Sequence, residues 1–424
     1  MKPTVLLLVL DAVGASTLEY LLDHYPGRPK LPNLSRLGLS RILAPRFAGR
    51  LGADGGRTYA ARVEQASASA DSVIGHREMV GIVDPGVYEL FPKGFPKDYI
   101  KALEVKIGRR TIFNKMAGGM EAIALNADEH EKTGRPIVYA SKCDPLIQIA
   151  MNEAVIPVPE QHRIAETAFC LAREMGIPVT RAIARAYVRA PNGEITRTVN
   201  RHDAVLPLPG PTLVDVLREA GVWTVAVGKT SDLVTTAYHE RIKLSRRDFL
   251  DPALGLRFVH PKGKDTNPYN IQGTLDALIS AAHVYRPHGT FIFSNLVDAD
   301  SVYGHTKDVP GAIRSLEEVD RILPLFQKNL RRGDFLIITA DHGMEHRPDY
   351  GYHHKEPLPL IVECIGDGAA LAAGRQVRPG RSLCEIGYRV AQAFGCEKEY
   401  CRDCGFRPQW RKNSSGITVS GPDV

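Results

Sequence analysis

The stretch Phe335-Leu336-Ile337-Ile338-Thr339-Ala340-Asp341-His342-Gly343 decides the fold that this sequence predicts. Its apolar run leads directly into Asp341 and His342, and this pattern is typical of a buried strand that ends in metal ligands. A further imidazole, His353, follows after a short polar loop. We therefore expect these three side chains to belong to one site at the carboxyl end of a strand.

Two other stretches repeat this pattern. The run from Ser294 to Val297 leads to Asp300 and then His305, and the run from Val5 to Leu10 leads to Asp11. Open α/β sheets bind their ligands at the carboxyl ends of the strands. The three stretches therefore predict a single cluster of carboxylates and imidazoles at one edge of a sheet.

The composition is that of an ordinary globular protein. The chain has 424 residues, of which 44% are hydrophobic and 24% are charged, and this length favours two domains. The formal net charge of +6 is spread along the chain. We therefore expect no nucleic-acid partner, whereas a mildly basic surface suits a small anionic substrate.

The sequence contains no span of the ~18–20 apolar residues that a membrane helix requires. The N-terminal run reads better as a core strand than as a signal peptide, so we expect a cytoplasmic protein without a membrane partner. The seven cysteines are odd in number and scattered. Cys396, Cys401 and Cys404 lack a fourth neighbouring ligand, which favours structural or free thiols over a zinc site.

Turn-forming residues divide the chain into a core and an insertion. They cluster at 84–86 and 91–96, and a proline-rich segment covers 206–211. Between them, a helical pattern at 159–175 precedes an alternating, strand-like pattern at 179–188. We expect a discontinuous core domain over 1–87 and 207–412, an inserted domain over 88–206 and a mobile tail over 413–424.

Helical and strand patterns alternate in the rest of the core. The expected helices cover 213–220, 274–285, 312–330 and, as the last one, 383–394, and the expected strands cover 224–227, 290–297 and 335–340. This alternation predicts an α/β fold with a mainly parallel sheet flanked by helices. The inserted domain is expected to be a smaller α+β unit.

The ligand candidates suffice for two divalent cations. They are Asp11, Asp300, His305, Asp341, His342 and His353. Oxygen and nitrogen ligands without thiolates fit Mn²⁺ or Zn²⁺ better than Ca²⁺. Two such ions about 3.5–4 Å apart are the usual arrangement for phosphoryl transfer, so the cluster indicates that class of reaction.

A nucleophile is predicted at Ser72. Asp71 can cap a helix whose first turn contains Ser72, and a helix N-terminus attracts phosphate through its free N–H groups and its dipole. A metal-bound serine would lose its proton more readily and could carry a phosphoryl group. The alternative is an ordinary serine- and alanine-rich helix cap, which this stretch taken alone favours.

Short motifs, found in one order from the N-terminus to about residue 360, carry a resemblance to a known family. They include Asp11-Ala12-Val13-Gly14, Leu31-Pro32-Asn33-Leu34, Asp71-Ser72-Val73-Ile74-Gly75-His76-Arg77-Glu78, Val227-Gly228-Lys229, Asn295-Leu296-Val297-Asp298, Tyr303-Gly304-His305, Ala340-Asp341-His342-Gly343 and His353-His354-Lys355-Glu356. In these motifs the sequence resembles the phosphopentomutase family of the alkaline phosphatase superfamily. The Asn295 and Tyr303 motifs point to the pentomutase branch rather than to cofactor-independent phosphoglycerate mutase.

The resemblance implies an alkaline-phosphatase-like core with two metal sites. Asp300, His305 and His353 would hold one ion, and Asp11, Asp341 and His342 would hold the other, with Ser72 as its fourth ligand and phosphoryl carrier. Mn²⁺ is the expected metal, with Zn²⁺ or Mg²⁺ as alternatives. A sugar bisphosphate could serve as activator.

The resemblance also implies that the inserted domain is a cap that binds the sugar phosphate. Asp144 would bind sugar hydroxyls, and the candidates for the distal phosphate are Arg181, Arg185 and Arg201, with Lys229 in the core domain. Spacing by four places Arg181 and Arg185 on one face of the expected strand. The alternative for each arginine is a solvated surface charge.

The sequence departs from the family pattern at several positions. Ser72 stands where the family has threonine, and Ala70 stands where it has lysine. His354 is a rival of His353 as a metal ligand, and Cys143 belongs to a motif with one extra residue. These departures bear on the substrate more than on the metal site.

The expected reaction is the interconversion of ribose 1-phosphate, or its deoxy form, with the 5-phosphate through phosphorylated Ser72. The alternatives are a phosphohydrolase or a mutase of another phosphosugar in the same superfamily, and a non-catalytic phosphosugar-binding protein. The sequence leaves the oligomeric state open.

Overall fold

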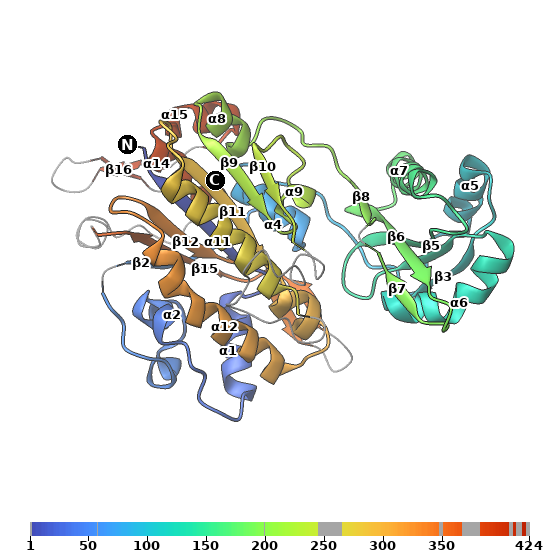
Figure 1. Cartoon of the computed structure of the whole chain (residues 1–424), viewed down its shortest axis with the longest axis horizontal. Helices are drawn as coiled ribbons and strands as arrows, with labels where there is room; N and C mark the ends of the chain where they lie inside the picture. Colours follow the sequence, from blue (N-terminus) through green and yellow to red (C-terminus); the bar gives the residue numbers. More distant parts are fainter. Residues whose placement is uncertain are drawn as a thin grey trace. The chain divides into compact units, whose positions relative to one another are not determined.

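The computed structural model describes residues 2–56, 58–198, 200–244, 265–346, 351–366, 382–406, 410–412 and 418–420. The chain divides into two compact units (Figure 1). The core unit contains Met1–Pro85 and Leu208–Val424, and the inserted unit contains Gly86–Pro207. Most of the tail over 413–424 lies outside the described residues; its strand β17 (Thr418–Ser420) pairs with β16 (Trp410–Lys412).

A seven-stranded sheet forms the centre of the core unit. Its strand order is β10 (Glu240–Ile242), β9 (Trp223–Val227), β11 (Thr290–Leu296), β1 (Thr4–Leu10), β12 (Phe335–Thr339), β15 (Leu358–Cys364) and β2 (Tyr59–Val63). The first five strands run parallel, and β15 pairs antiparallel with both of its neighbours. The central strands read as unbroken apolar runs because both faces of the sheet are covered.

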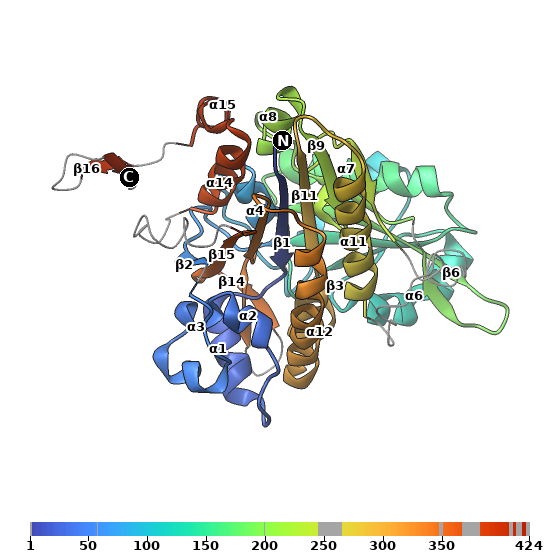
Figure 2. The same ribbon diagram turned by 60° about the vertical axis from the view of Figure 1, so that its left-hand side comes forward.

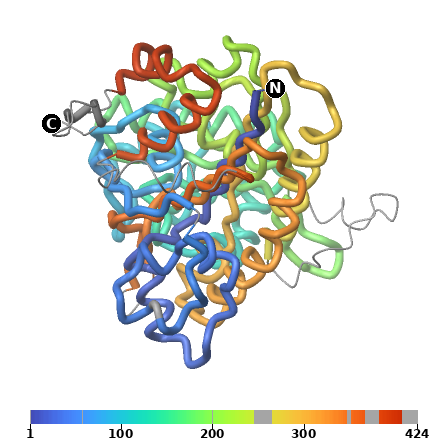
Figure 3. Tube along the Cα trace, turned by 90° about the vertical axis from the view of Figure 1, so that its left-hand side faces the viewer, coloured from blue at the N-terminus to red at the C-terminus, as the bar shows by residue number. Residues whose placement is uncertain are grey.

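The N-terminal strand lies between two strands from much later in the chain. In the register of the sheet, Leu7 lies opposite Phe293 on β11 and Ile337 on β12, and all three side chains are buried. Figure 3 shows the blue N-terminal trace passing between orange segments. The residues that follow these three parallel strands therefore meet at one edge of the sheet.

Helices cover both faces of this sheet. Figure 2 shows α11 (Asn267–His283) and α12 (Val309–Lys328) on one face and α4 (Ser72–Met79) and α14 (Cys384–Phe394) on the other. Among the described residues, the core unit also contains α1 (Ala15–His24), α2 (Pro32–Arg36), α3 (Leu39–Ile42), the 3-10 helix η1 (Pro45–Arg50), α8 (Leu213–Glu219), α9 (Thr230–Leu233), the π-helical turn η3 (Ala299–Gly304) and α15 (Glu397–Asp403).

The inserted unit has a mixed sheet of its own. Its strands are β3 (Ile112–Met116), β4 (Ile137–Ala140), β5 (Leu146–Asn152), β6 (Arg181–Arg189), β7 (Ile195–Arg197) and β8 (His202–Val205), and its helices are α5 (Lys97–Ile107), α6 (Gly119–Thr133) and α7 (Val158–Glu174). Along β5, Ile147 and Ile149 belong to one apolar cluster and Ala150 to another. The sheet therefore separates two apolar layers, as the alternation of side chains along a strand requires.

The expected fold class is confirmed, because a mainly parallel sheet flanked by helices carries an inserted α+β unit. Helix α11 begins at Asn267 rather than at residue 274, since the Asp298 carboxylate accepts hydrogen bonds from the backbone N–H groups of Thr266 and Asn267 at 2.9 and 2.8 Å. The expectation that the helix over 383–394 is the last one is wrong, because α15 follows it.

Two further observations concern the whole described part of the chain. Among these residues, no helix combines the length and the apolar composition that crossing a membrane would require. The seven cysteines all lie in the described ranges, and none of them forms a disulfide.

Candidate metal centre and nucleophile

The predicted carboxylates converge at the carboxyl ends of three adjacent strands. Asp11 follows β1, Asp341 follows β12, and Asp300 lies in the π-helical turn η3 (Ala299–Gly304) after β11. All three residues are buried. The parallel order of β11, β1 and β12 therefore assembles one buried acidic centre from three distant stretches of sequence.

The first ligand group contains Asp300, His305 and His353. Asp300 Oδ1 lies 3.2 Å from Nε2 of His305 and 3.2 Å from Nε2 of His353. His305 Nδ1 lies 2.9 Å from the carbonyl oxygen of Gly351, so Nδ1 carries the proton of a neutral ring. The unprotonated Nε2 of His305 then faces a carboxylate oxygen, and two acceptors at this distance need a proton or a cation between them.

The rival ligand His354 does not enter this group. Strand β14 (Gly351–His354) pairs with β13 (Gly343–His346), and neighbouring side chains on a strand point to opposite faces. His353 faces Asp300, whereas His354 is exposed. In this hairpin register His353, and not His354, therefore lies beside Asp300.

The second ligand group contains Asp11, Asp341, His342 and Ser72. His342 Nε2 lies 3.5 Å from Asp11 Oδ1, 3.6 Å from Asp341 Oδ2 and 3.3 Å from Ser72 Oγ. Ser72 Oγ lies 3.4 Å from Asp11 Oδ1. Metal–ligand bonds of about 2.0–2.2 Å place two ligands of a tetrahedral site about 3.4 Å apart, so these spacings fit a shared cation.

The electrostatics of the second group also fit a cation. Asp341 Oδ2 is buried and, although His76 Nδ1 lies 3.2 Å away, it accepts no well-aligned hydrogen bond from the described residues. Burial alone would lower the pKa of His342, but the Asp341 and Asp11 carboxylates raise it to about 10. Burial alone would raise the pKa of Asp11, but Lys229 and His342 hold it well below its usual value. The group thus attracts positive charge, which a bound proton or a metal ion can supply.

Ser72 reaches this group because helix α4 begins at the centre of the site. The Asp71 side chain caps the helix and accepts a hydrogen bond from the Val73 N–H at 2.8 Å. A Cβ atom on Gly75 would lie 2.0 Å from the carbonyl oxygen of Asp341. Glycine at this position therefore lets the first turn of α4 approach the loop that carries Asp341 and His342.

The structure places Lys229 beside Ser72. Its Nζ lies 3.0 Å from Ser72 Oγ and 2.7 Å from Asp11 Oδ2. Burial would lower the pKa of Lys229, but the Asp11, Asp300 and Asp341 carboxylates raise it above its usual value, so the side chain carries a positive charge. The spacing of residues along the sequence did not indicate the contact between Lys229 and Ser72, because this contact depends on β9 lying beside β11 in the sheet.

Two buried side chains that sequence reasoning gave no role lie behind Asp11. Asn295 Nδ2 donates to Asp11 Oδ2 at 2.9 Å and lies 2.6 Å from His76 Nε2. His76 Nδ1 lies 2.9 Å from the Ser72 carbonyl oxygen and 3.2 Å from Asp341 Oδ2. Both belong to motifs quoted above, which is the one sequence signal that marked them.

Glu356 supports the loops of the site. Its carboxylate accepts hydrogen bonds from the backbone N–H of Thr17 at 3.1 Å and from the Thr17 hydroxyl at 2.5 Å. A Cβ atom on Gly14 or Gly343 would lie 1.9 or 2.0 Å from Glu356 Oε1. The two glycines therefore leave room for a buried carboxylate that joins the loop after Asp11 to the loop after His342.

The inserted unit contains a separate basic group, formed by the predicted arginines around one carboxylate. Arg201 makes a two-point ion pair with Asp203 at 2.5 and 2.6 Å. Burial would raise the pKa of Asp203, but Arg201, Arg181 and Arg185 lower it strongly. Burial, together with Arg201, lowers the pKa of Arg185 to about 10. Asp144 lies 3.8 Å from Arg181 Nη2, so all four predicted residues of this unit belong to one neighbourhood.

Sequence reasoning missed three neighbours of this basic group. Gln148 Oε1 accepts hydrogen bonds from the Tyr139 hydroxyl and from Arg185 Nε, both at 2.8 Å. A Cβ atom on Gly119 would lie 2.1 Å from Arg197 Nη2 and 3.1 Å from the Tyr139 hydroxyl. Arg197 therefore lies beside the same tyrosine. The positive charge of the arginines in this group exceeds the negative charge of its two carboxylates, Asp144 and Asp203.

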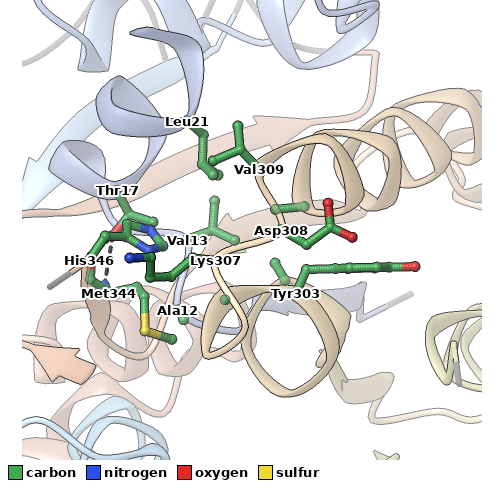
Figure 4. A pocket seen from close by; sticks show the side chains of 13 residues that line it. Ala12, Val13, Thr17, Leu21, Tyr303, Lys307, Asp308, Val309, Met344 and His346 are labelled. Carbon is green, nitrogen blue, oxygen red and sulfur yellow. Dashed lines mark hydrogen bonds between the residues drawn. The ribbon is translucent and has the colours of Figure 1, made fainter. Parts of the chain in front are cut away.

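A small pocket beside Ala12 and Val13 contains none of the predicted site residues. Figure 4 shows mostly apolar side chains around it, with Lys307 and His346 close together and Asp308 turned away from them. The metal-ligand candidates therefore do not open into this pocket.

Comparisons of the sequence with known proteins give a consistent assignment. Residues 255–398 match the Metalloenzyme superfamily. The chain is 33% identical to a phosphopentomutase of Caldanaerobacter subterraneus subsp. tengcongensis, covering 93% of this chain and 95% of the relative. It is 35% identical to phosphopentomutases of Pseudothermotoga lettingae and Levilactobacillus brevis, covering 88% and 82% of this chain and 87% and 82% of theirs. Among solved structures, the PH0037 protein from Pyrococcus horikoshii aligns over 93% of this chain and 98% of its own, at 15% identity and a TM-score of 0.45.

Proposed function

Because the chain belongs to the phosphopentomutase family, we propose that it interconverts ribose 1-phosphate, or its deoxy form, with the 5-phosphate and that Ser72 carries the phosphoryl group. The chain is thus an enzyme that transfers phosphate within one molecule. The observation that carries the assignment of Ser72 is the position of its hydroxyl, 3.3 Å from His342 Nε2 and 3.0 Å from Lys229 Nζ.

The two ligand groups would hold two divalent cations. We assign Asp300, His305 and His353 to one ion and Asp11, Asp341, His342 and Ser72 to the other, in agreement with the spacings of 3.2–3.6 Å within each group. Buried oxygen and nitrogen donors without thiolates favour Mn²⁺, with Zn²⁺ or Mg²⁺ as alternatives. Bound cations would stabilise negative charge on the phosphoryl oxygens and favour the ionised form of Ser72.

The residues of the chain account for the transfer steps. Phosphorylated Ser72 would give its phosphoryl group to the free sugar hydroxyl. The Ser72 O–P bond breaks as the sugar O–P bond forms, and the hydroxyl proton passes to the departing Ser72 oxygen. The product is a sugar bisphosphate, and the Ser72 oxygen then accepts the other phosphoryl group and releases the isomeric monophosphate. Lys229 would neutralise charge on the Ser72 oxygen whenever its bond to phosphorus breaks. A sugar bisphosphate could therefore prime an unphosphorylated enzyme.

The basic group of the inserted unit is a candidate for recognition of the sugar phosphate. Arg181, Arg185 and Arg201 together carry more positive charge than Asp203 neutralises, and guanidinium groups match phosphate in two-point hydrogen bonding. Asp144, beside Arg181, could accept hydrogen bonds from sugar hydroxyls.

We also propose a cytoplasmic location, in keeping with seven cysteines that form no disulfide.

A coupled assay tests the proposal. The purified enzyme, loaded with Mn²⁺ and primed with ribose 1,5-bisphosphate, should convert ribose 1-phosphate to the 5-phosphate, and Ser72→Ala should abolish this turnover. No turnover by the primed wild-type enzyme would reject the mutase activity. Release of inorganic phosphate at a rate comparable to isomerisation would instead favour the phosphohydrolase.

Intact mass spectrometry tests the covalent step separately. Incubation with the bisphosphate should add the mass of one phosphate to the wild-type chain and none to Ser72→Ala. A phosphate that Ser72→Ala also acquires would remove Ser72 from the role of phosphoryl carrier.

A further inference from the structure

Three buried residues connect in a line that ends at Asp11. His76 lies on helix α4, Asn295 lies on strand β11, and Asp11 follows strand β1. All three residues are fully buried, with none of their surface exposed to solvent. The line runs from His76 Nε2 to Asn295 Nδ2 at 2.6 Å and from Asn295 Nδ2 to Asp11 Oδ2 at 2.9 Å.

The surroundings of His76 determine which ring nitrogen carries the proton. Nδ1 lies 2.9 Å from the Ser72 carbonyl oxygen and 3.2 Å from Asp341 Oδ2. Both of these atoms are acceptors, so Nδ1 must be the donor. In the neutral ring Nε2 is then an acceptor, and it accepts one of the two N–H bonds of the Asn295 amide.

The amide of Asn295 has only one orientation that satisfies this arrangement. Its nitrogen carries two N–H bonds, one for His76 Nε2 and one for Asp11 Oδ2. The flipped amide would place Oδ1 against a carboxylate oxygen and an unprotonated ring nitrogen, which repel it. In the orientation found, Oδ1 is buried and has no hydrogen-bond partner among the described residues.

This line fixes which oxygen of Asp11 is available for other partners. Oδ2 receives the Asn295 N–H and the Lys229 ammonium, whereas Oδ1 faces His342 Nε2 at 3.5 Å and Ser72 Oγ at 3.4 Å. Residues behind metal ligands often set the orientation of those ligands.

We infer that His76 and Asn295 are positioning residues that present Oδ1 of Asp11 to the metal centre. The inference rests on the proposed role of Asp11 as a metal ligand. His76 sets the orientation of the Asn295 amide, and Asn295 holds the Asp11 carboxylate. Each of the two residues acts through the next member of the line.

Two substitutions of His76 separate this role from simple packing. His76→Asn retains a donor near Nδ1 but has no atom at the position of Nε2, whereas His76→Gln places an acceptor oxygen near that position. Titration calorimetry of the metal-free protein with Mn²⁺ should give a dissociation constant raised about 10- to 100-fold for His76→Asn. His76→Gln should remain within a few-fold of wild type, and kcat with Mn²⁺ should follow the same order.

A buried histidine in the inserted unit provides the matched control. His130 has the same pair of contacts, with Nδ1 2.7 Å from the Arg135 carbonyl oxygen and Nε2 accepting from the Asn152 N–H at 2.9 Å. His130→Asn should lower the thermal unfolding midpoint as much as His76→Asn does, without changing Mn²⁺ affinity. Equal Mn²⁺ affinity in wild type, His76→Asn and His76→Gln would overturn the inference, as would equal losses in both His76 variants.

Asn295→Ala interrupts the line from its other side and keeps the inference testable if the His76 variants do not fold. It should weaken Mn²⁺ binding at least as much as His76→Asn, and the double variant should lose no more affinity than Asn295→Ala alone, since both changes break one line. Wild-type Mn²⁺ affinity in Asn295→Ala would overturn the inference.

Asp11→Ala separates a failure of the proposed metal role of Asp11 from a failure of the positioning role of His76 and Asn295. If Asp11→Ala binds Mn²⁺ as wild type does, the proposed metal role of Asp11 fails and the inference fails with it. If Asp11→Ala loses Mn²⁺ while His76→Asn and Asn295→Ala keep wild-type affinity, only the inference fails.

Discussion

Gly75 packs directly against the backbone of Asp341, because a Cβ atom on Gly75 would lie 2.0 Å from the Asp341 carbonyl oxygen. This contact joins the helix that begins with Ser72 to the loop that carries two ligands of the second group. The absence of a side chain at Gly75 therefore lets Ser72 lie close to Asp341 and His342, two of the predicted metal ligands.

Gly75→Ala should separate Ser72 from His342. The added methyl group must displace either α4 or the Asp341 backbone, and overpacking of a rigid site costs about 1–3 kcal/mol. We expect kcat to fall about 100-fold or more, because a displacement of about 1 Å can cost that much, while the chain still folds with a lower unfolding midpoint. Gly49→Ala is the matched control, since Gly49 also lacks a positive φ but has no atom within 4 Å of its Cβ position. An unchanged kcat in Gly75→Ala would show that α4 can move without harm.

Lys229→Met should lower kcat far more than it raises KM. The Lys229 ammonium lies 3.0 Å from Ser72 Oγ. In the proposed reaction, this is the oxygen on which charge changes when the phosphoryl group leaves or arrives. Loss of one preorganised group at such a site costs about 10²–10³ in kcat. Lys243→Met is the matched control, because Lys243 is half-exposed and pairs with Asp232. A raised KM with normal kcat would instead support the role in substrate binding that the sequence suggested.

The sequence predicted those parts of the site that depend on strand ends. An apolar run followed by Asp or Asp-His marks the end of a buried strand. Because neighbouring parallel strands bring such ends together, Asp11, Asp300 and Asp341 could be grouped from the sequence alone. The choice between His353 and His354 could not be made, because it depends on the register of a hairpin that pairs Met344 with His353.

Contacts that depend on the order of strands in the sheet, or on how a helix packs against the sheet, could not be predicted. Lys229 lies at Ser72 because β9 neighbours β11, and His76 reaches Asn295 because Gly75 lets α4 approach the sheet. Neither contact has a characteristic spacing along the chain. Likewise, the Asp298 carboxylate caps the first turn of α11, although Asp298 lies 31 residues after Asn267 in the sequence. The helical pattern alone therefore placed the start of α11 too late.

Glu78→Gln should destabilise the chain without involving the ligands directly. The buried Glu78 carboxylate accepts hydrogen bonds at 2.8 Å from the backbone N–H groups of Ala66, Ser67 and Leu383 and from the Ser382 hydroxyl. An amide would turn its NH₂ group toward at least one N–H donor, and an unsatisfied buried donor costs about 1–3 kcal/mol.

Chemical denaturation should therefore show the free energy of unfolding of Glu78→Gln reduced by about 1–3 kcal/mol. Glu174→Gln is the control, since Glu174 forms an exposed ion pair with Lys106 at 2.8 Å, and such pairs contribute less than about 1 kcal/mol. Equal stability of the two variants would mean that Glu78 does not hold these segments together.

Metal binding should release a proton from His342. Its Nδ1 lies 3.0 Å from the Gly343 carbonyl oxygen, and the neighbouring carboxylates raise its pKa to about 10 without a cation. Below that pH the metal-free ring is protonated, and a metal ion can bind Nε2 only after this proton leaves. The affinity for Mn²⁺ should therefore rise about tenfold per pH unit between pH 7 and 9, with about one proton released per ion bound in the second ligand group. Calorimetry in buffers of different ionisation enthalpy measures this number, and a value near zero at pH 7 would contradict the assignment of His342 as a ligand.

The same raised pKa of His342 stabilises the metal-free fold. This contribution is fully present below the ordinary histidine pKa of 6.5 and should disappear as the pH rises toward 10.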